Sequence, residues 1–291
     1  MIIRSLLYVP GSNQRFIEKA HARGADAIII DLEDAVAASM KTAAREALTQ
    51  SVSTAGKAGA PVFVRINNTV DRLLADAEAA CRAGAFGLYV PKVESPSLLR
   101  QLASHLEPIE RQLGRAPIVF VPLIESPAGV LAAAEIGRGV RVFALSGGGE
   151  DLATSMGAKP LPQVLSLPKQ LIHLAAKAAG VLSFGLLRSV ADYVDLEGMR
   201  EAASEARLFG FDGASCIHPS VVPVLNAAFS PPPEEIDWAR KVVAADRLAA
   251  SEGKGAHMVD GAFVDAPIVA RAQAILALAD RIEKTSEIVN G

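Results

Sequence analysis

The sequence predicts an α/β protein built as a (β/α)8 barrel with a C-terminal helical extension. Short apolar runs alternate with longer segments of helical periodicity, and eight such runs can be counted. Most of the runs are continuously apolar, as expected of parallel strands that are buried on both faces. Because eight βα units are the number that closes a barrel, a closed barrel is favoured over an open sheet.

The predicted strands end in Pro, Gly or charged residues. They are Ile3–Val9, Ala25–Asp31, Val62–Ile66, Gly87–Val90, Ile118–Ile124, Val140–Leu145, Val181–Phe184 and Gly213–Ile217. Apolar residues spaced three and four apart predict helices between them, among others at Leu73–Ala83, Leu98–Leu113, Leu165–Ala179 and Met199–Phe209. These alternating elements predict a barrel domain over residues 1–230.

Residues 231–291 continue beyond the eighth unit and are not needed to close the barrel. Pro231-Pro-Pro233 ends one element, and Glu234–Glu252 has the pattern of an amphipathic helix with an acidic first turn. The glycine-punctuated segment Gly253–Gly261 is interpreted as a loop, followed by a last helix at about Pro267–Lys284. This tail is either a lid or oligomer arm or a simple packing helix, and both alternatives stay open.

The composition predicts a folded chain with no general affinity for polyanions. Hydrophobic residues make up 51% and charged residues 21%, which supplies a packed core and argues against disorder. The net charge of -3 argues against binding nucleic acid or an anionic membrane, and neither a membrane span nor a signal peptide is expected. Cys81 and Cys216 lie far apart without metal-ligand spacing, which favours a reducing, cytoplasmic location.

Charged and polar residues gather directly after the predicted strands. In barrels of this kind functional residues lie at the carboxyl ends of the strands. A random surface would not concentrate such residues on one rim, so a site for a small charged ligand is the leading hypothesis. The residues are Tyr8, Asp31, Glu33, Asp34, Arg65, Lys92, Glu94, Glu125, Glu150, Asp151 and His218.

Glu125 and Asp151 are the candidate metal ligands. Each lies just past an apolar run, and if both runs are parallel strands the two carboxylates emerge side by side. Such a pair suits a hard divalent cation such as Mg2+. The alternative is that these strand-end acids cap helices or pair with Lys and Arg. The glycines Gly147–Gly149 lack the Lys-Ser/Thr of a phosphate-binding loop and are interpreted as room for a ligand.

Arg65 is the candidate anchor for a substrate carboxylate. Its guanidinium presents a rigid fork that a carboxylate can meet with two hydrogen bonds. The alternative is an ion pair with Asp31 or Glu33. Glu33 and Asp34 are interpreted as groups behind the site that orient Arg65 or a metal-bound water.

Three further basic residues could serve a ligand. Lys92 could neutralise charge that develops during a reaction, or it could pair with Glu94. Arg15 and Lys19 are four residues apart in the first predicted helix, so both can face the barrel mouth as a small basic patch. Without other information a solvated helix face is the simpler interpretation of that pair.

Together these motifs resemble the citrate lyase β-subunit-like group of the HpcH/HpaI aldolase superfamily, which includes malyl-CoA and citramalyl-CoA lyases. The similarity covers nearly the whole chain, and it is specific because of the order and spacing of motifs that are individually weak. The motifs are Arg4–Gly11, Asp31–Val36, Val64–Asn67, Val90–Ser95, Gly148–Leu152, Gly210–Gly213, Ile217–Pro219, Gly253–Ala256 and Gly261–Pro267.

The resemblance implies a TIM barrel with a Mg2+ held by Glu125 and Asp151 and a substrate carboxylate bound by Arg65. It implies that Asp265 is the catalytic acid, on a C-terminal segment that reaches into a neighbouring subunit. Residues 231–291 would then be an arm or lid that completes the neighbour's site. A homotrimer or a higher multiple of it is the implied assembly.

The resemblance also implies an acyl-CoA ligand that lies along Tyr8, Arg15 and Lys19. The implied activity is cleavage of a 3-hydroxy-3-carboxy acyl-CoA, of the citramalyl-CoA or malyl-CoA type, to acetyl-CoA and pyruvate or glyoxylate. Two alternatives stay open. One is the β subunit of a lyase acting on a citryl thioester of an acyl carrier protein, and the other is a non-catalytic barrel that binds acyl-CoA or a keto acid.

Two segments depart from the pattern of the group. Relatives commonly carry an Ile-Asp pair after the seventh strand, whereas this chain has Gly185-Leu-Leu-Arg-Ser189, with Leu187 opposite the Asp. Ser155-Met-Gly157 replaces an Asp-Leu-Gly found in many members. The first departure leaves the barrel and the metal chemistry untouched, but the preference for the carrier or the acyl group could differ.

Overall fold

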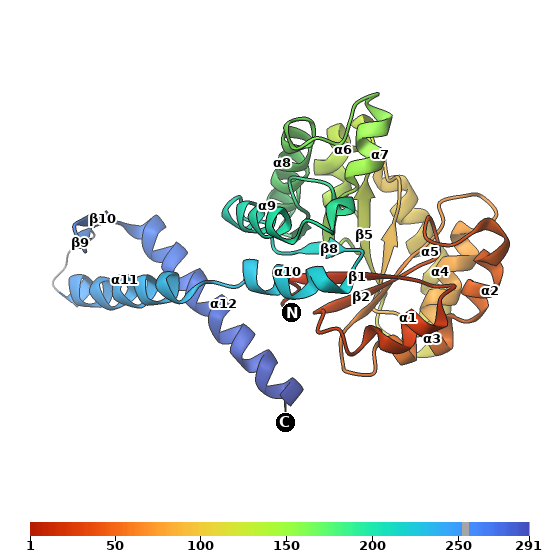
Figure 1. The fold of residues 1–291 in the computed structure, drawn as a ribbon, viewed down its shortest axis with the longest axis horizontal. Helices are drawn as coiled ribbons and strands as arrows, with labels where there is room; N and C mark the ends of the chain where they lie inside the picture. The colour runs from red at the N-terminus through yellow and green to blue at the C-terminus, as the bar shows by residue number, and fades with distance from the viewer. Residues whose placement is uncertain (252–255, 291) are drawn as a thin grey trace. The chain divides into compact units, whose positions relative to one another are not determined.

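The computed structural model describes residues 1–251 and 256–290 and confirms the (β/α)8 barrel (Figure 1). The barrel strands are β1 (Ser5–Pro10), β2 (Ala27–Asp31), β3 (Val62–Arg65), β4 (Gly87–Val90), β5 (Val119–Ile124), β6 (Ala144–Gly147), β7 (Leu182–Phe184) and β8 (Ala214–Cys216). The α-helices up to residue 228 are α1 (Gln14–Ala20), α2 (Lys41–Glu46), α3 (Leu48–Ala55), α4 (Leu73–Arg82), α5 (Pro96–Leu113), α6 (Pro127–Gly137), α7 (Gly149–Ser155), α8 (Pro162–Ala179), α9 (Leu196–Leu208) and α10 (Val222–Ala228). Short 3-10 turns lie at Ala38–Met40, Val190–Asp192 and Pro219–Val221.

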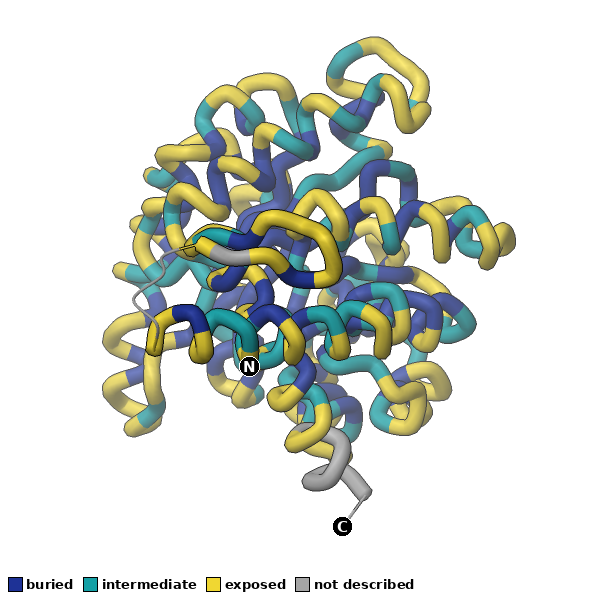
Figure 2. Tube along the Cα trace, turned by 90° about the vertical axis from the view of Figure 1, so that its left-hand side faces the viewer, coloured by how far each residue is buried: buried dark blue, intermediate teal, exposed yellow. Residues whose placement is uncertain are grey.

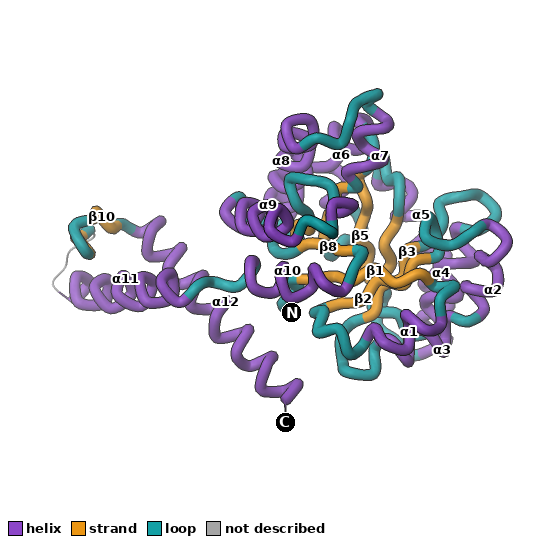
Figure 3. Tube along the Cα trace, viewed as in Figure 1, coloured by secondary structure: helices purple, strands orange, loops and turns teal. Residues whose placement is uncertain are grey.

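The strands are parallel neighbours in the order β7-β6-β5-β4-β3-β2-β1-β8. A single parallel bridge between Phe184 and Gly213 joins the two ends of this sheet. The N–H of Gly185 donates to the carbonyl of Gly213 at 2.9 Å, and the N–H of Asp212 donates to that of Ser183 at 2.9 Å. The barrel therefore closes between β7 and β8 through a short contact, with the strands inside and the helices around them (Figure 3).

The strands are apolar on both faces because each face packs against a different core. One cluster includes Ile29, Phe63 and Tyr89 and fills the barrel interior. Their immediate neighbours, such as Ile28 and Val64, belong to a larger cluster shared with the surrounding helices. Successive side chains of a strand point to opposite faces, so a strand between two cores must be apolar at every position. Figure 2 shows this burial along the chain.

The β6 strand begins later than the predicted Val140, at Ala144. Arg141 has a φ of 61°, a left-handed conformation that interrupts an extended chain. A lone bridge pairs Val142 with Phe120 before the regular ladder starts. Periodicity alone does not reveal such a backbone conformation, so the predicted start was wrong by four residues.

Residues Ile3–Phe229 form one compact unit, and Met1–Ile2 with Ser230–Gly291 form a second. The second unit contains α11 (Pro233–Ser251), α12 (Ala266–Asn290) and a small apolar core that includes Val242, Val264 and Ala272. None of the described helices is long and apolar enough to cross a membrane.

The predicted loop Gly253–Gly261 is wrong in its second half, where the chain forms an antiparallel hairpin. Strand β9 (His257–Val259) pairs with β10 (Ala262–Val264) across Asp260 and Gly261, whose φ values are 48° and 80°. Two central residues with positive φ make the type I′ turn that Asp-Gly favours, so the hairpin had a sequence signal. Residues 252–255, with the predicted helix end Glu252 and most of the Gly253–Ala256 motif, lie outside the described residues.

Candidate functional site

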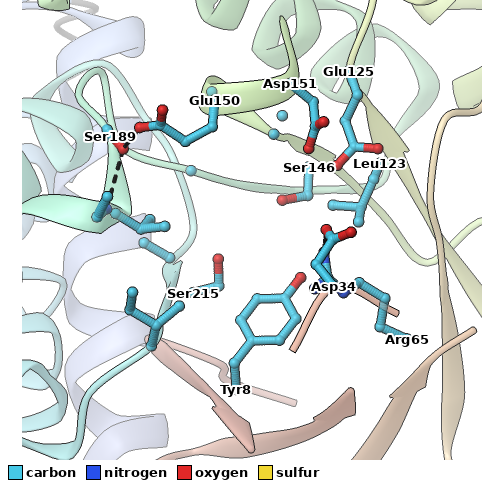
Figure 4. Close-up of a pocket in the computed structure, with 18 of the residues that line it drawn as sticks. Tyr8, Asp34, Arg65, Leu123, Glu125, Ser146, Glu150, Asp151, Ser189 and Ser215 are labelled. Carbon is cyan, nitrogen blue, oxygen red and sulfur yellow. Dashed lines mark hydrogen bonds and ion pairs between the residues drawn. The ribbon is translucent and has the colours of Figure 1, made fainter. Parts of the chain in front are cut away.

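A cavity of about 480 Å3 lies at the carboxyl ends of the barrel strands. Seven of the strand-end residues singled out from the sequence line it: Tyr8, Asp31, Asp34, Arg65, Glu125, Glu150 and Asp151. Figure 4 shows the carboxylates of Glu125 and Asp151 near one another, with the hydroxyl of Tyr8 pointing into the same space. The expectation that strand-end residues converge is confirmed for these seven.

The neighbouring strands β5 and β6 bring Glu125 and Asp151 together. Leu123 pairs with Ser146 and Ile124 with Gly147, so the residues that follow the two strands leave the sheet side by side. Helix α6 begins at Pro127, two residues after Glu125, and its first turn is capped by Ser126, whose Oγ accepts from the N–H of Gly129 at 3.1 Å.

Glu125 is only 5% exposed, and burial raises the pKa of its carboxyl to about 7. The negative charges of Glu33 and Asp151 raise this pKa further, against the backbone hydrogen bond from Lys92 and the charge of Arg65. Buried carboxylates that repel one another favour either a proton or a cation between them. The electrostatics of the site therefore suit a bound cation.

Two backbone features shape the space around Glu125. Lys92 has a φ of 55°, and its N–H donates to Oε2 of Glu125 at 2.9 Å. On the other side, a Cβ at residue 148 would lie 2.5 Å from Oε1 of Glu125. A Cβ at residue 149 would lie 3.1 Å from Nζ of Lys169. Gly147, Gly148 and Gly149 all line the cavity, in keeping with their interpretation as room for a ligand, and at Gly148 and Gly149 the missing Cβ also leaves space for the side chains of Glu125 and Lys169.

The donor set at Glu125 and Asp151 fits Mg2+. Among the described residues there is no group of three or more His, Cys, Asp and Glu side chains that could hold a metal. Mg2+ is commonly bound through only one or two carboxylates and keeps waters or substrate oxygens as its other ligands. A pair of carboxylates in a cavity open to substrate meets this need.

Arg65 lies at the end of β3 and is held by acidic residues. Its Nε donates to Asp31 Oδ1 at 2.7 Å and its Nη2 to Asp31 Oδ2 at 2.6 Å. Its Nη1 lies 3.1 Å from Asp34 and 3.1 Å from Glu33. The ion pair that the sequence left as an alternative is thus formed, and Glu33 and Asp34 both contact Arg65. The guanidinium also lies over the Tyr8 ring, 5.1 Å from its centroid.

Asp31 also organises the acidic loop that follows β2. It accepts hydrogen bonds from the N–H groups of Glu33 and Ala35, both at 2.9 Å, as well as from Arg65. Asp31 is 1% exposed, and its carboxylate accepts hydrogen bonds from three residues, so it stabilises both the acidic loop and the position of Arg65. Burial raises the pKa of Glu33, while Arg65 acts in the opposite direction.

The other predicted basic residues stand outside the cavity wall. Nζ of Lys92 lies 3.4 Å from Glu33, whereas Glu94 accepts a hydrogen bond from Ser126. Burial lowers the pKa of Lys92, but Glu33 and Asp151 outweigh it and raise the pKa above its ordinary value. Arg15 and Lys19 are exposed on α1 and do not line the cavity.

Asp265 directly precedes α12 in the second compact unit. Its backbone carbonyl accepts from the N–H groups of Ile268 and Val269, both at 3.0 Å, which starts the helix. The side chain is half-buried.

Sequence reasoning missed Lys169, which lines the cavity from α8 and is 4% exposed. It also left the partners of Glu150 unidentified, and the structure shows that Glu150 accepts a hydrogen bond from Ser189. A signal for Lys169 existed, because it stands in the apolar series Leu165, Ile172 and Ala176 on one face of the helix. Leu187 is 2% exposed within the outer core and does not line the cavity, whereas its neighbour Leu186 does.

Comparisons with known proteins agree with this geometry. A family model described as HpcH/HpaI aldolase/citrate lyase matches residues 4–219. A (3S)-malyl-CoA thioesterase of Cereibacter sphaeroides is 36% identical over 282 residues, which cover 96% of this chain and 95% of that protein. The mitochondrial citramalyl-CoA lyase of Homo sapiens is 31% identical over 299 residues, which cover 97% of this chain and 86% of that protein. Among solved structures, the Mycobacterium tuberculosis protein CitE in complex with magnesium, acetoacetate and coenzyme A matches with a TM-score of 0.76 and 32% identity, covering 95% of this chain and 97% of that one.

Proposed function

The chain belongs to the HpcH/HpaI aldolase/citrate lyase family, and we propose that it is a magnesium-dependent carbon–carbon lyase acting on an acyl-CoA. The substrate is a 3-hydroxyacyl-CoA with a carboxylate on the hydroxyl-bearing carbon, of the citramalyl-CoA or malyl-CoA type. One observation carries this proposal: a single cavity is lined by two carboxylates suited to Mg2+, Glu125 and Asp151, and by a guanidinium, Arg65. That combination recognises neighbouring hydroxyl and carboxylate groups on one carbon.

Glu125 and Asp151 would hold the Mg2+, which when bound polarises the oxygens of the substrate's hydroxyl and carboxylate groups. Arg65 binds the carboxylate through the N–H groups that Asp31 does not use. Asp31 and Asp34 keep the guanidinium in place, so less of its side-chain freedom is lost when substrate binds.

In the reaction a general base takes the proton of the hydroxyl group and the bond between C2 and C3 breaks. The hydroxyl-bearing carbon becomes the carbonyl of a keto acid, and the bonding electrons leave as a thioester enolate. Protonation of the enolate carbon then yields acetyl-CoA, and Asp265 is proposed to supply this proton. The products are acetyl-CoA and either pyruvate or glyoxylate, which differ by one methyl group.

The proposed assembly is a homotrimer, or a higher multiple of it, in which Asp265 serves the site of a neighbouring subunit. Arg15 and Lys19, exposed on α1, are proposed to bind the phosphates of coenzyme A. Tyr8 would lie between them and the metal, because its hydroxyl points into the cavity. A cytoplasmic location is proposed, in keeping with two buried free thiols at Cys81 and Cys216.

A second candidate function is hydrolysis of the thioester. The (3S)-malyl-CoA thioesterase is 36% identical to this chain over 95% of its own length, and it favours this candidate. In that reaction water adds to the thioester carbonyl, the C–S bond breaks, and free coenzyme A leaves with a hydroxy diacid. The same ligand would bind in both cases, but a different bond would break.

The test is an assay of the purified protein with Mg2+ and a panel of thioesters: malyl-CoA, citramalyl-CoA and a citryl thioester of acyl carrier protein. Keto acid is followed with a hydrazine reagent and free thiol with a disulfide reagent. Keto acid without free thiol is the expected result. Free thiol without keto acid would establish the thioesterase instead, and tight binding without either product would indicate a non-catalytic barrel.

A further inference from the structure

Lys169 is a buried lysine in the cavity wall to which the proposed reaction assigns no role. It lies on the inward face of α8, and burial lowers the pKa of its ammonium group to about 8, with Glu150 acting in the opposite direction. An ammonium group is costly to bury unless it is hydrogen-bonded. Its hydrogen-bond partners therefore identify what the side chain is there to hold.

Those partners belong to the loop that follows β7. Nζ of Lys169 donates to the carbonyl of Leu186 at 2.7 Å and to that of Arg188 at 2.9 Å. The end of the loop is tied separately, because the hydroxyl of Ser189 donates to Glu150 on α7. The loop is thus attached to two helices, with Lys169 holding its middle.

The attached loop forms an apolar part of the cavity. Leu186, Val190 and Ala191 line it from this loop, and Ile217 lines it from the end of β8. Arg65 lies on the other side of the cavity from Ser189 (Figure 4). One cavity therefore combines a charged side, suited to a hydroxy acid, with an apolar side, suited to an alkyl chain.

We propose that Lys169 is a positioning residue that holds Leu186 and Val190 as a binding wall for the alkyl chain of an acyl thioester. The inference rests on the proposed function, since it assumes an acyl-CoA whose carboxylate end binds at Arg65. With that end fixed, the acyl carbons point toward the apolar side. The wall contacts any carbons that the acyl group carries beyond acetyl, so longer acyl thioesters bind more tightly than acetyl-CoA, the product of the proposed reaction.

The test measures binding of acetyl-CoA, propionyl-CoA and butyryl-CoA to the full-length protein by calorimetry, in saturating Mg2+ and pyruvate, because pyruvate supplies the carboxylate that binds at Arg65. Each methylene group buried on the wall should tighten binding by about fourfold in the parent protein. Lys169→Met keeps the length and packing of the side chain but removes both hydrogen bonds to the loop. It should bring the three affinities within about twofold of one another and leave Mg2+ affinity unchanged.

Arg115→Met is the matched control. Arg115 also donates to two backbone carbonyls, those of Cys81 and Ala85, both at 2.6 Å, but at the amino ends of the strands. The control should lower stability but keep the affinity gradient, that is, the increase in binding affinity from acetyl-CoA to butyryl-CoA. Ser189→Ala, which removes the second tie of the loop, should reduce the gradient if Lys169→Met does not fold.

Three outcomes would overturn the inference: a parent protein without the gradient, a gradient that survives in Lys169→Met and Ser189→Ala, or a gradient that Arg115→Met also loses. The binding measurement needs no turnover. A normal gradient in a protein that forms no keto acid would therefore refute the lyase proposal alone, and a protein that forms keto acid without a gradient would refute only the role of Lys169.

Discussion

Asp31 binds one edge of Arg65 with two hydrogen bonds, from Nε at 2.7 Å and from Nη2 at 2.6 Å. A guanidinium has five N–H donors, and Asp34 accepts from Nη1 as well. Glu33 lies 3.1 Å from Nη1 as an ion pair without a hydrogen bond. The three hydrogen bonds therefore leave one donor on each terminal nitrogen, which is the number that a bidentate carboxylate needs. The acidic residues thus position Arg65 while leaving it able to bind substrate.

Glu125→Gln and Asp151→Asn should each abolish Mg2+ binding and activity. Loss of an outer partner of a metal ligand commonly costs 10- to 100-fold, so loss of a ligand itself should exceed about 100-fold. Stability should change little, because removal of either charge relieves repulsion around the buried Glu125. Calorimetry with Mg2+ and thermal unfolding measure the two effects. Glu107→Gln, at an exposed position of α5, is the control, and full activity of either site variant in the presence of a chelator would disprove the metal assignment.

Gly148→Ala should impair the metal site without changing its ligands. The new Cβ would lie 2.5 Å from Oε1 of Glu125, so the carboxylate must move. Misplacement of a catalytic group by about 1 Å can cost roughly 100-fold in rate. Gly147→Ala is the matched control, since the nearest atom to its Cβ would be the tip of Ile172, at 3.1 Å, and the next atoms would lie in ordinary contact at 3.7 Å or more. Equal loss of kcat/KM in the two variants would argue against the close approach at Gly148.

Arg65→Lys should weaken binding of pyruvate by about tenfold while binding of acetyl-CoA stays unchanged. Lysine keeps the charge but not the planar fork, so the bidentate contact with the carboxylate is lost. A lost hydrogen bond to a charged group is worth about 1.5–3 kcal/mol, which corresponds to tenfold or more. Calorimetry in saturating Mg2+ measures both affinities.

The paired variant Arg15→Ala with Lys19→Ala is the counterpart of that experiment. It should weaken binding of acetyl-CoA and leave binding of pyruvate unchanged, because the two side chains are exposed on α1 outside the cavity. If the double variant binds acetyl-CoA as the parent does, the two residues are an ordinary solvated helix face.

The free energy of unfolding should fall as the pH drops below about 6.5, the ordinary pKa of histidine, in part because of His173. His173 stacks on Phe211 with 4.5 Å between ring centroids, and burial followed by the charge of Lys177 lowers its pKa. The unfolded chain therefore takes up this proton at a higher pH than the folded chain, which favours unfolding in acid. Between neutral and acidic pH, the melting temperature of His173→Gln should fall less than that of the parent. If the melting temperatures of the two proteins fall in parallel with pH, His173 does not have this role.

Asp265→Asn and Glu125→Gln should each be nearly inactive alone but complement one another after subunit exchange. If Asp265 serves a neighbouring subunit, random mixing of equal amounts in a closed ring leaves roughly one site in four with both groups intact. Activity near that fraction would support the shared site. Activity that stays at background after verified exchange would exclude it.

The sequence by itself predicted the barrel and the pair of carboxylates that emerge together after β5 and β6. The runs of apolar residues at Ala27–Asp31 and Gly87–Val90 can be satisfied only by strands buried on both faces. Once the strands are parallel, residues that follow neighbouring strands must emerge together, as Glu125 and Asp151 do. Hydrophobic periodicity is a local pattern, and residues that follow neighbouring parallel strands always emerge at the same edge of the sheet. Both could therefore be applied to the sequence without coordinates.

The tertiary structure alone decided which partners these residues have. Asp31 binds Arg65 across 34 positions of sequence, and Lys169 reaches the carbonyls of a loop 17 and 19 positions away. Gly148 is required by a carboxylate on another strand, not by its own conformation, since its φ is -84°. Such contacts depend on strand register, on helix rotation and on side-chain packing, which are set by the whole core together and leave no periodic trace in the chain.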